Sequence, residues 1–276
     1  MLSSELNTKL ATLQGKLQEW ESILIAYSGG VDSSLLLKVA SMTPVKVLAV
    51  TAVSPTYPQA EIAAATDLAR KLGVQHMVIN SKEMGNPKFC ANPPERCYHC
   101  KKELFADLQK LAWEHGLKVI VDGANIDDCD DFRPGRKAAR ECGVKSPLQE
   151  AGLTKADIRQ LARHLGLPNW DKPSMACLSS RIPYGQMITP AKLGQVAAAE
   201  AYLRQLGLQE IRVRHHGSIA RIEVNPAAFA LLIDNQVRQA MVDRFHEIGF
   251  TYVTLDLEGF RSGSMNAVLS AEERKL

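Results

Sequence analysis

The fold is decided by residues 23–37, which read ILIAYSGGVDSSLLL. An apolar, β-branched run ends at Ser28-Gly29-Gly30, and an apolar segment with helical spacing begins directly behind it. This order predicts a buried strand, a tight turn and the N-terminus of a helix. Glycines let the backbone approach a ligand closely, and the first turn of a helix offers unpaired N–H groups and partial positive charge. The stretch therefore predicts a cradle for a phosphate chain.

The cradle has no Gly-Lys-Ser/Thr sequence and so is not a Walker A loop. Ser-Gly-Gly-Val-Asp-Ser after a strand resembles the PP-loop of the ATP pyrophosphatases. The resemblance implies that ATP is cleaved between its α and β phosphates and that AMP is transferred to a carboxylate or carbonyl oxygen. The residues implied to hold pyrophosphate are Ser28, Gly29, Gly30, Val31, Asp32, Ser33 and Ser34. An ordinary glycine-rich turn is the alternative for a motif this short.

The composition is that of an ordinary globular protein. The chain has 276 residues, of which 46% are hydrophobic and 23% charged, with a net charge of +3. This charge is too small to indicate a nucleic-acid surface, and no nucleic-acid partner is predicted. No apolar run reaches the length of a membrane span, and residues 1–22 lack the apolar core of a signal peptide, so we expect no membrane association and a cytoplasmic location. The six cysteines are irregularly spaced, which favours thiols or metal ligands over disulfides.

Strands alternate with helices through the first part of the chain. Leucines at helical spacing predict an opening amphipathic helix, and β-branched runs predict further strands at 45–53, 74–80 and 117–121. Helices are expected at 59–72 and 101–115, and prolines predict irregular structure over 81–97. The alternation predicts an α/β fold, with a Rossmann-like parallel sheet of the PP-loop type and helices on both of its faces.

The pattern changes near residue 186. A helix is predicted over 190–206, a hairpin over 210–215 and 218–224, a helical stretch interrupted near residue 234, and a last strand over 251–257. We therefore predict a PP-loop domain at 1–186 and a small α+β domain at 187–276.

Ligands of such parallel sheets lie beyond the carboxyl ends of the strands. The PP-loop, the segment 81–100 and the Asp122-Gly123 turn are thus expected to share one crevice, with Asp122 and Gly123 as ATP contacts. The PP-loop resemblance adds Ala26 and Thr51 as backbone contacts of the adenine, with plain strand residues as the alternative. For the Asp-rich stretch 127–131, binding of Mg²⁺ or ribose and simple solvation both stay open.

Cys97 and Cys100 form a CxxC pair, which is expected in the loop just before the helix at 101. Such a pair can bind one metal or cluster, but a complete site needs more ligands. Cys177 is the expected third ligand, and three cysteines leave one iron of a [4Fe–4S] cluster open for an exogenous ligand. A redox disulfide, a zinc site completed by His99 and unrelated thiols are the alternatives. The remaining cysteines show no partner pattern; they are Cys90, Cys129 and Cys142.

Further stretches make the resemblance more specific. They are DFRPG at 131–135, SSRIPYG at 179–185, RVR at 212–214, YVTLDL at 252–257 and GFRSG at 259–263. Together with the PP-loop they resemble the LarE family of ATP-dependent sulfur transferases over nearly the whole chain. The resemblance implies adenylation of a carboxylate of pyridinium-3,5-biscarboxylic acid mononucleotide and replacement of its oxygen by sulfur. This reaction belongs to the biosynthesis of the nickel-pincer nucleotide cofactor of lactate racemase.

Members of this family differ in their sulfur source. Some give up the sulfur of a single cysteine before Ser-Ser-Arg, whereas others carry a CxxC plus a cysteine in that stretch and resemble cluster enzymes. Cys97, Cys100 and Cys177 place this chain with the second group, as ligands of a [4Fe–4S] cluster whose open iron takes sulfide from an unidentified donor. Ala176 stands where single-cysteine members carry their sulfur. Sacrifice of Cys177 is the alternative.

Positive side chains complete the predicted site. Mg²⁺ is expected on the phosphates, and Lys101 is expected to steady the adenylate unless it is simply exposed. Arg212 and Arg214 are two apart on a predicted strand and so face the same side. With Ser180 and Arg181 they are predicted to bind a phosphate or carboxylate of the small-molecule nucleotide substrate, with solvated arginines as the alternative. The resemblance also implies a homo-oligomer, a ring-like hexamer, with residues 187–276 serving substrate binding and oligomerisation.

Other functions stay open for a PP-loop chain. They are tRNA thiolation by an enzyme with a CxxC pair, a glutamine- or ammonia-using ligase related to NAD or GMP synthetases, and a non-catalytic nucleotide sensor.

Overall fold

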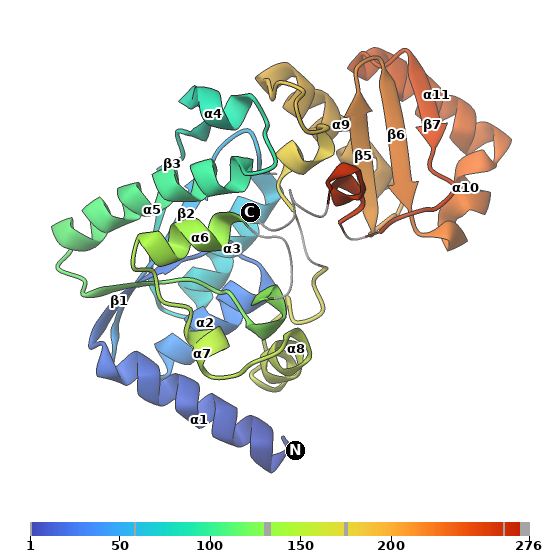
Figure 1. The fold of residues 1–276 in the computed structure, drawn as a ribbon. Helices are drawn as coiled ribbons and strands as arrows, with labels where there is room; N and C mark the ends of the chain where they lie inside the picture. Colours follow the sequence, from blue (N-terminus) through green and yellow to red (C-terminus); the bar gives the residue numbers. More distant parts are fainter. Residues whose placement is uncertain (1, 58, 130–133, 174–175, 262, 271–276) are drawn as a thin grey trace. The chain divides into compact units, whose positions relative to one another are not determined.

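The chain folds into two compact units, and each is described by itself. The structure is a computed structural model that describes residues 2–57, 59–129, 134–173, 176–261 and 263–270. The first unit comprises Met1–Asn86 and Glu95–Met175, and the second comprises Pro87–Pro94 and Ala176–Leu276 (Figure 1). The division at residue 186 into two domains of distinct roles stays a prediction. Within the described ranges, no helix combines the length and hydrophobicity that a membrane crossing needs.

The first unit is built on a parallel sheet, as predicted. Its strands are β1 (Ser22–Ala26), β2 (Lys46–Val53), β3 (Gln75–Asn80) and β4 (Val119–Val121). They lie side by side in the order β3-β2-β1-β4, and every pair is parallel. In the register of the central strand, Ile25 lies between Ala49 of β2 and Val121 of β4. The carboxyl ends of β1, β2 and β4 therefore meet at one edge of the sheet.

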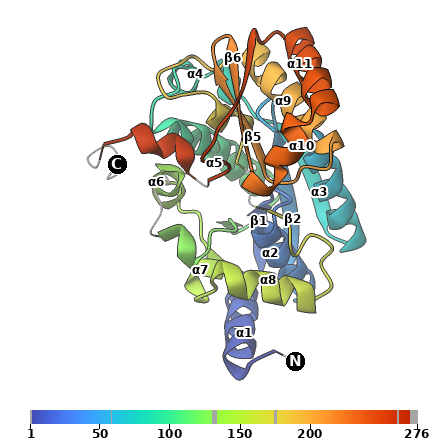
Figure 2. The same cartoon turned by 90° about the vertical axis from the view of Figure 1, so that its right-hand side faces the viewer.

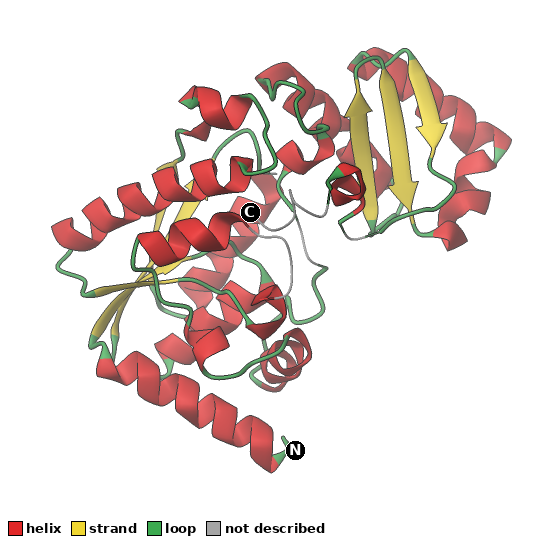
Figure 3. Cartoon of the chain, in the orientation of Figure 1, coloured by secondary structure: helices red, strands yellow, loops and turns green. Residues whose placement is uncertain are grey.

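Helices cover both faces of this sheet, as the alternation of buried side chains requires (Figure 3). Ile23 and Ile25 pack on one face and Leu24 on the other. The helices on the face of Ile25 are α1 (Ser4–Glu19), α2 (Val31–Ser41), α3 (Gln59–Lys71), α7 (Pro147–Glu150) and α8 (Lys155–His164). The face of Leu24 carries α5 (Arg96–Glu114) and α6 (Pro134–Glu141). Short 3₁₀ turns, η1 (Glu83–Gly85) and η2 (Ile126–Cys129), lie in the connections.

One expectation for this unit is wrong. Residues 81–97 were expected to be irregular and the CxxC pair to lie in a loop, but α5 already begins at Arg96. Pro93 and Pro94 precede this helix, where proline removes no intrahelical hydrogen bond, and no residue from 95 to 100 opposes a helical turn. Cys97 and Cys100 therefore lie on the first turn of α5.

The second unit is a small α+β fold. Its strands β5 (Ile211–His216), β6 (Ile219–Val224) and β7 (Tyr252–Leu255) are ordered β5-β6-β7, with an antiparallel first pair and a parallel second pair. The predicted hairpin is confirmed, and it turns at Gly217, whose φ of +66° suits glycine. The other elements are α4 (Pro87–Cys90), η3 (Leu178–Arg181), α9 (Pro190–Gln205), η4 (Pro226–Ala228), α10 (Phe229–Ile233), α11 (Asn235–Ile248) and η5 (Ser264–Val268).

Helices α9 and α11 pack on one face of the second sheet (Figure 2). Leu203 of α9 and Phe245 of α11 are buried against Val213 and Ile222. The alternate residues of β5, among them Arg212 and Arg214, therefore face away from this core. A layer of charged side chains covers that second face, and the candidate site of this unit lies there.

Candidate active site

The PP-loop has the predicted geometry of a strand, a tight turn and a helix N-terminus. Gly30 is the N-cap of α2 and offers no side chain to the first N–H groups of the helix. The Ser33 hydroxyl donates to the carbonyl of Gly30 at 3.2 Å, accepts from the N–H of Ser28 at 3.3 Å and lies 3.1 Å from the Ser28 hydroxyl. Ser34, by contrast, is fully buried and accepts from Asn169 at 2.9 Å. Ser28 and Ser33 are thus the hydroxyl pair gathered at the turn.

Two glycines of the predicted ATP site are required by packing. Gly29 has a φ of +71°, and a Cβ there would lie 2.8 Å from the Cβ of Ala65 on α3. A Cβ on Gly123 would lie 2.9 Å from the backbone nitrogen of Ser33. Both glycines therefore let neighbouring segments close against the PP-loop, and their contact with phosphate stays a prediction.

Asp32 of the PP-loop is paired with Lys155, which sequence reasoning missed. The ammonium of Lys155 donates to both carboxylate oxygens of Asp32, at 2.6 and 2.7 Å, and both side chains are partly exposed. Lys155 is the first residue of α8, and its backbone N–H donates to Asp127 at 2.7 Å. The first turns of α2 and α8 are thus joined beside the phosphate cradle.

The described part of the Asp-rich stretch forms hydrogen bonds with the backbone. Asp127 accepts from the backbone N–H of Lys155 at the start of α8, and Asp128 accepts from the backbone of Asn125 at 3.0 Å. Asp122, a predicted ATP contact, accepts from Ser146 at 2.7 Å and from the backbone of Ala124 at 3.1 Å. Asp130 and Asp131 lie outside the described residues. Ligand contacts of Asp122 stay a prediction.

The segment after α8 forms hydrogen bonds with the PP-loop. Asn169 donates to the carbonyl of Gly29 at 3.2 Å as well as to Ser34, and Lys172 forms an ion pair with Glu61 of α3. The ammonium of Lys172 also lies 3.5 Å from the Gly29 carbonyl. Lys155 and Lys172 therefore bring two positive charges to the loop, and neither followed from the motif.

A pocket opens beside the PP-loop at the carboxyl ends of β1 and β2. Its lining residues are Ala26, Tyr27, Ser28, Val50, Thr51, Ala52, Tyr57, Glu61, Ile62, Lys101, Leu104 and Leu108. The structure thus brings four predicted site residues, Ala26, Ser28, Thr51 and Lys101, to one pocket. Its mostly apolar walls suit a planar base. Ile62 and Leu104 were missed, although Leu104 and Leu108 follow Lys101 at helical spacing.

Thr51, which lines the pocket, has polar contacts with residues of the neighbouring segments. The Thr51 hydroxyl donates to the carbonyl of Tyr27 at 2.8 Å and lies 2.8 Å from a ring nitrogen of His76. Burial lowers the pKa of His76, and burial raises the pKa of the Tyr27 hydroxyl, so both are neutral near pH 7. Because its hydroxyl hydrogen is donated to Tyr27, Thr51 has only its backbone N–H as a donor for a ligand.

The CxxC pair lies on the first turn of α5, and α6 packs against this turn. Cys97 is exposed and Cys100 half-buried, and their spacing of three places them on one face of α5. Tyr98 between them donates to Glu141 at 2.7 Å. Gly135 of α6 lies so close that a Cβ there would meet the Lys101 side chain at 3.0 Å.

Two thiols at this spacing fit the cysteine ligands of an iron–sulfur cluster or of zinc. In the part of the chain that the structure describes, however, no three His, Cys, Asp or Glu side chains gather as a metal site. Cys177 belongs to the second unit. A [4Fe–4S] cluster and Mg²⁺ therefore stay proposals.

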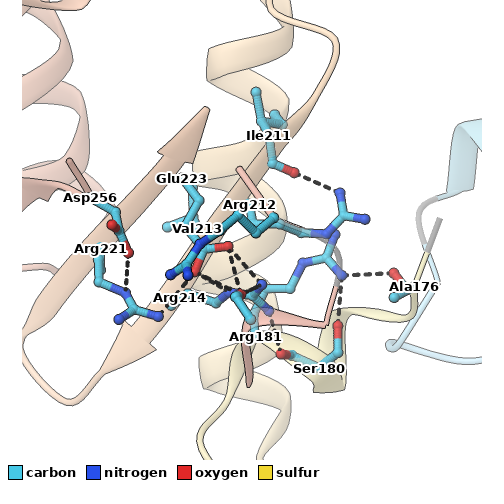
Figure 4. A network of polar contacts seen from close by, with 12 residues as sticks. Ala176, Ser180, Arg181, Ile211, Arg212, Val213, Arg214, Arg221, Glu223 and Asp256 are labelled. Atoms are coloured by element: carbon cyan, nitrogen blue, oxygen red, sulfur yellow. Dashed lines mark hydrogen bonds and ion pairs between the residues drawn. The ribbon is translucent and has the colours of Figure 1, made fainter. Parts of the chain in front are cut away.

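Arg181 follows Cys177 closely and is bound on both edges of its guanidinium (Figure 4). Its Nε and Nη2 donate to Glu200 at 2.7 and 3.1 Å, and Arg181 and Glu200 are 1% and 0% exposed. Its Nη1 donates to the carbonyls of Ala176 and Cys177, at 2.8 and 3.1 Å, and to the Ser180 hydroxyl at 2.8 Å. Burial alone would raise the pKa of Glu200, but the charge and hydrogen bonds of Arg181 hold that pKa below its usual value.

Arg214 forms a second buried pair in the same network. It donates to both oxygens of Glu223, at 2.9 and 2.7 Å, and its Nη1 donates to the carbonyl of Ser180 at 2.8 Å (Figure 4). Ser264 and Arg221 also contact Glu223. Like Arg181, Arg214 directs its donors to a carboxylate and to the chain next to Cys177. Substrate contacts of these arginines stay a prediction.

Arg212 lies on the same face of β5 as Arg214, as predicted. Its guanidinium lies 4.9 Å from the ring centroid of Phe260 and donates to the carbonyl of Ile211 at 2.7 Å. Burial, aided by the charges of Arg181 and Arg214, lowers the pKa of Arg212 to about 10. Arg212 is still protonated at neutral pH, and this crowding of cations favours an anion beside it.

Three relatives place this geometry in context, although no family model matches the chain. An uncharacterized protein of Synechocystis is 46% identical over 96% of this chain and 99% of its own length. The pyridinium-3,5-bisthiocarboxylic acid mononucleotide synthase of Lactiplantibacillus plantarum is 40% identical over 96% of each chain. The tRNA-specific 2-thiouridylase MnmA of Beijerinckia indica is 26% identical over 64% of this chain and 51% of its own length. Similarity to the synthase thus extends over nearly the whole chain, whereas similarity to the thiouridylase is partial.

Proposed function

Since this chain belongs to the family of pyridinium-3,5-bisthiocarboxylic acid mononucleotide synthases, the LarE family, we propose that it inserts sulfur into pyridinium-3,5-biscarboxylic acid mononucleotide. The chain is an ATP-dependent sulfur transferase of the PP-loop class. The observation that carries the proposal is the 40% identity to the synthase over 96% of both chains. The place of this reaction in nickel-pincer nucleotide biosynthesis and lactate racemase maturation is part of the proposal.

The first step is adenylation of the substrate carboxylate. A carboxylate is a poor electrophile because its leaving group would be oxide, and adenylation replaces that group with AMP. The pocket lined by Ile62 and Leu104 takes the adenine, and the PP-loop holds the departing pyrophosphate where negative charge develops. Mg²⁺, when bound, would neutralise phosphate charge, and Asp122 is the carboxylate we propose to hold it, since both oxygens of Asp32 accept from Lys155.

Lys155 supplies a positive charge to the same cradle. Its ammonium neutralises Asp32 through both carboxylate oxygens, and α8 fixes its backbone. Neutralising this carboxylate beside the helix N-terminus removes a repulsion that would weaken binding of a phosphate chain. We place Lys155 with Ser28 and Ser33 in the pyrophosphate site.

The sulfur step needs a sulfide close to the adenylated carbonyl. We propose Cys97, Cys100 and Cys177 as the ligands of a cluster, because all three are thiols, two of them share one helical turn, and the carbonyl of Cys177 accepts from the guanidinium of Arg181. A [4Fe–4S] cluster, when bound, supplies an iron that carries sulfide. Lys101 lines the nucleotide pocket one residue after Cys100, so it can neutralise the adenylate beside the thiols. Sacrifice of the Cys177 sulfur is the alternative within the same reaction.

The second unit supplies cations for an anionic nucleotide. We assign the substrate phosphate or second carboxylate to Arg212, because its guanidinium lies on the charged face of β5 and is crowded by Arg181 and Arg214, which favours an anion beside it. A homo-oligomer and its hexameric form remain predictions from the family resemblance, and a cytoplasmic location remains a prediction from the sequence.

The test is an anaerobic reaction with the full chain. The protein is supplied with pyridinium-3,5-biscarboxylic acid mononucleotide, Mg²⁺-ATP and sodium sulfide, and AMP, pyrophosphate and thiocarboxylate are followed by liquid chromatography and mass spectrometry. We expect AMP and thiocarboxylate to appear in equal amounts. Formation of AMP only when tRNA replaces the mononucleotide would favour tRNA thiolation instead.

A further inference from the structure

The turn that carries Cys177 has little secondary structure to hold it. Cys177 is in an extended conformation, with φ −59° and ψ 155°, directly before η3. Its carbonyl nevertheless accepts three hydrogen bonds, from the Ser180 N–H at 3.0 Å, the Ser180 hydroxyl at 2.8 Å and Arg181 Nη1 at 3.1 Å. Arg181 also binds the carbonyl of Ala176. The backbone on both sides of the thiol is therefore held by one guanidinium and one hydroxyl.

The other edge of the same guanidinium is anchored in the core of the second unit. Glu200 on α9 binds Nε and Nη2 of Arg181, and it also accepts from the backbone N–H of Val213 on β5 at 3.1 Å. Arginine has five donors in a rigid plane, so it can bridge a carboxylate on one side and carbonyls on the other. Lysine has a single nitrogen and cannot reproduce this bridge.

We propose that Arg181 is a positioning residue for Cys177, anchored by Glu200, and that it does not bind the substrate. This inference rests on the proposed function, in which Cys177 takes part in the sulfur step. A buried ion pair is a weak source of stability because both charges lose their hydration. Here the pair orients the one group that holds the Ala176 and Cys177 carbonyls.

The inference separates Arg181 from Arg212, although sequence reasoning placed both on the substrate. Removing a substrate contact weakens binding and raises KM, whereas misplacing a reacting group lowers kcat and leaves KM unchanged. Arg204 offers a matched control. It donates to the same Glu200 at 3.1 Å, is more exposed, and bonds to Glu200 without reaching residues 176–180 in the contacts of the network.

The experiment compares Arg181→Lys, Glu200→Gln and Arg204→Lys in the full chain. For Arg181→Lys we expect kcat to fall about tenfold or more with KM for the mononucleotide changed less than about twofold. Hydrogen–deuterium exchange of peptides covering 176–182 should become faster by a similar factor. Glu200→Gln should also lower kcat and speed exchange over 176–182. Arg204→Lys should match the unsubstituted protein in kcat and in exchange.

Two outcomes overturn the proposal. One is a large rise in KM for Arg181→Lys with unchanged exchange over 176–182, which would make Arg181 a substrate contact. The other is an equal rate of hydrogen–deuterium exchange over 176–182 in all three variants. If Arg181→Lys fails to fold, Glu200→Gln decides, since it keeps the guanidinium and weakens only its anchor. If the unsubstituted protein transfers no sulfur, the proposed function fails, while the exchange measurement still decides whether Arg181 holds the turn.

Discussion

The ammonium of Lys155 donates to both carboxylate oxygens of Asp32, at 2.6 and 2.7 Å, although the two residues are 123 positions apart in the chain. The contact joins the start of α8 to the start of α2, the helix whose N-terminus forms the phosphate cradle. The PP-loop is therefore completed by a cation from a distant segment.

Lys155→Met is expected to raise KM for Mg²⁺-ATP by about tenfold or more, because the cradle loses a cation beside the pyrophosphate. The free energy of unfolding should fall by no more than about 1 kcal/mol, since the ion pair is partly exposed. ATP titration and chemical denaturation measure the two effects. Lys16→Met is the control, because Lys16 pairs with Glu150 on α7 at 3.0 Å and leaves the PP-loop unchanged. A normal KM for ATP in Lys155→Met would remove Lys155 from the site.

Gly29→Ala is expected to destabilise the first unit by about 1–3 kcal/mol, because alanine resists a φ of +71° and its Cβ would overlap with Ala65. Ala65→Gly should cost about 1 kcal/mol by itself through lower helix propensity. Combined, the two substitutions should cost clearly less than the sum of the single changes, since Ala65→Gly removes the clashing methyl. Thermal and urea unfolding of the three variants measures this coupling. If the changes in unfolding free energy of the two single variants add up to that of the double variant, Ala65 of α3 does not restrict residue 29.

Acidification is expected to destabilise the second unit. Burial, aided by the charge of Lys192, lowers the pKa of His215 below 6.5, and burial with Arg221 does the same for His216. The unfolded chain then binds more protons than the folded chain as pH falls through 6.5, so stability is complete above that pH and declines below it. Melting temperatures between pH 7.5 and 5 measure the decline.

His215→Gln should make this decline shallower. His246→Gln should leave it unchanged, because His246 is exposed on α11. Equal slopes for the two variants would contradict the assignment to His215.

Anaerobically purified protein is expected to contain about four irons per chain with matching acid-labile sulfide. Cys97→Ala, Cys100→Ala and Cys177→Ala should each lose most of this iron, since each removes a thiolate ligand of the proposed cluster. Iron and sulfide analysis with visible absorption measures the loss. Cys142→Ala is the control, because Cys142 packs half-buried against the α5–α6 core. Full iron content in Cys177→Ala would exclude Cys177 as a ligand.

Local signals were sufficient for the parts of the fold that are contiguous in sequence. The run before Ser28, the glycine turn and the apolar helix behind it predicted β1, the PP-loop and α2, because each element is encoded within about ten residues. The start of α8 is also encoded locally, by the capping box of Thr154 and Asp157. The start of α5 was misplaced because prolines stop a helix before them but allow one directly after them.

Pairings between distant residues left no local signal. Nothing near Asp32 indicates Lys155, and nothing near Arg181 indicates that Glu200 would accept two of its hydrogen bonds. The alternation of Arg212 and Arg214 predicted that they share a face of β5, but not that Glu223 would bind Arg214 through both oxygens. Sequence reasoning identified the charged residues of the site, and the fold determined which carboxylates Arg181 and Arg214 bind.

The central claim is that sulfur comes from sulfide on a cluster and not from the chain itself. The direct measurement is the intact mass of the protein after anaerobic turnover with the mononucleotide, Mg²⁺-ATP and sodium sulfide. The account predicts several thiocarboxylates formed per chain and an unchanged protein mass. A chain lighter by one molecule of H₂S, with at most one sulfur transferred per chain, would show that Cys177 had given up its sulfur and would contradict the account.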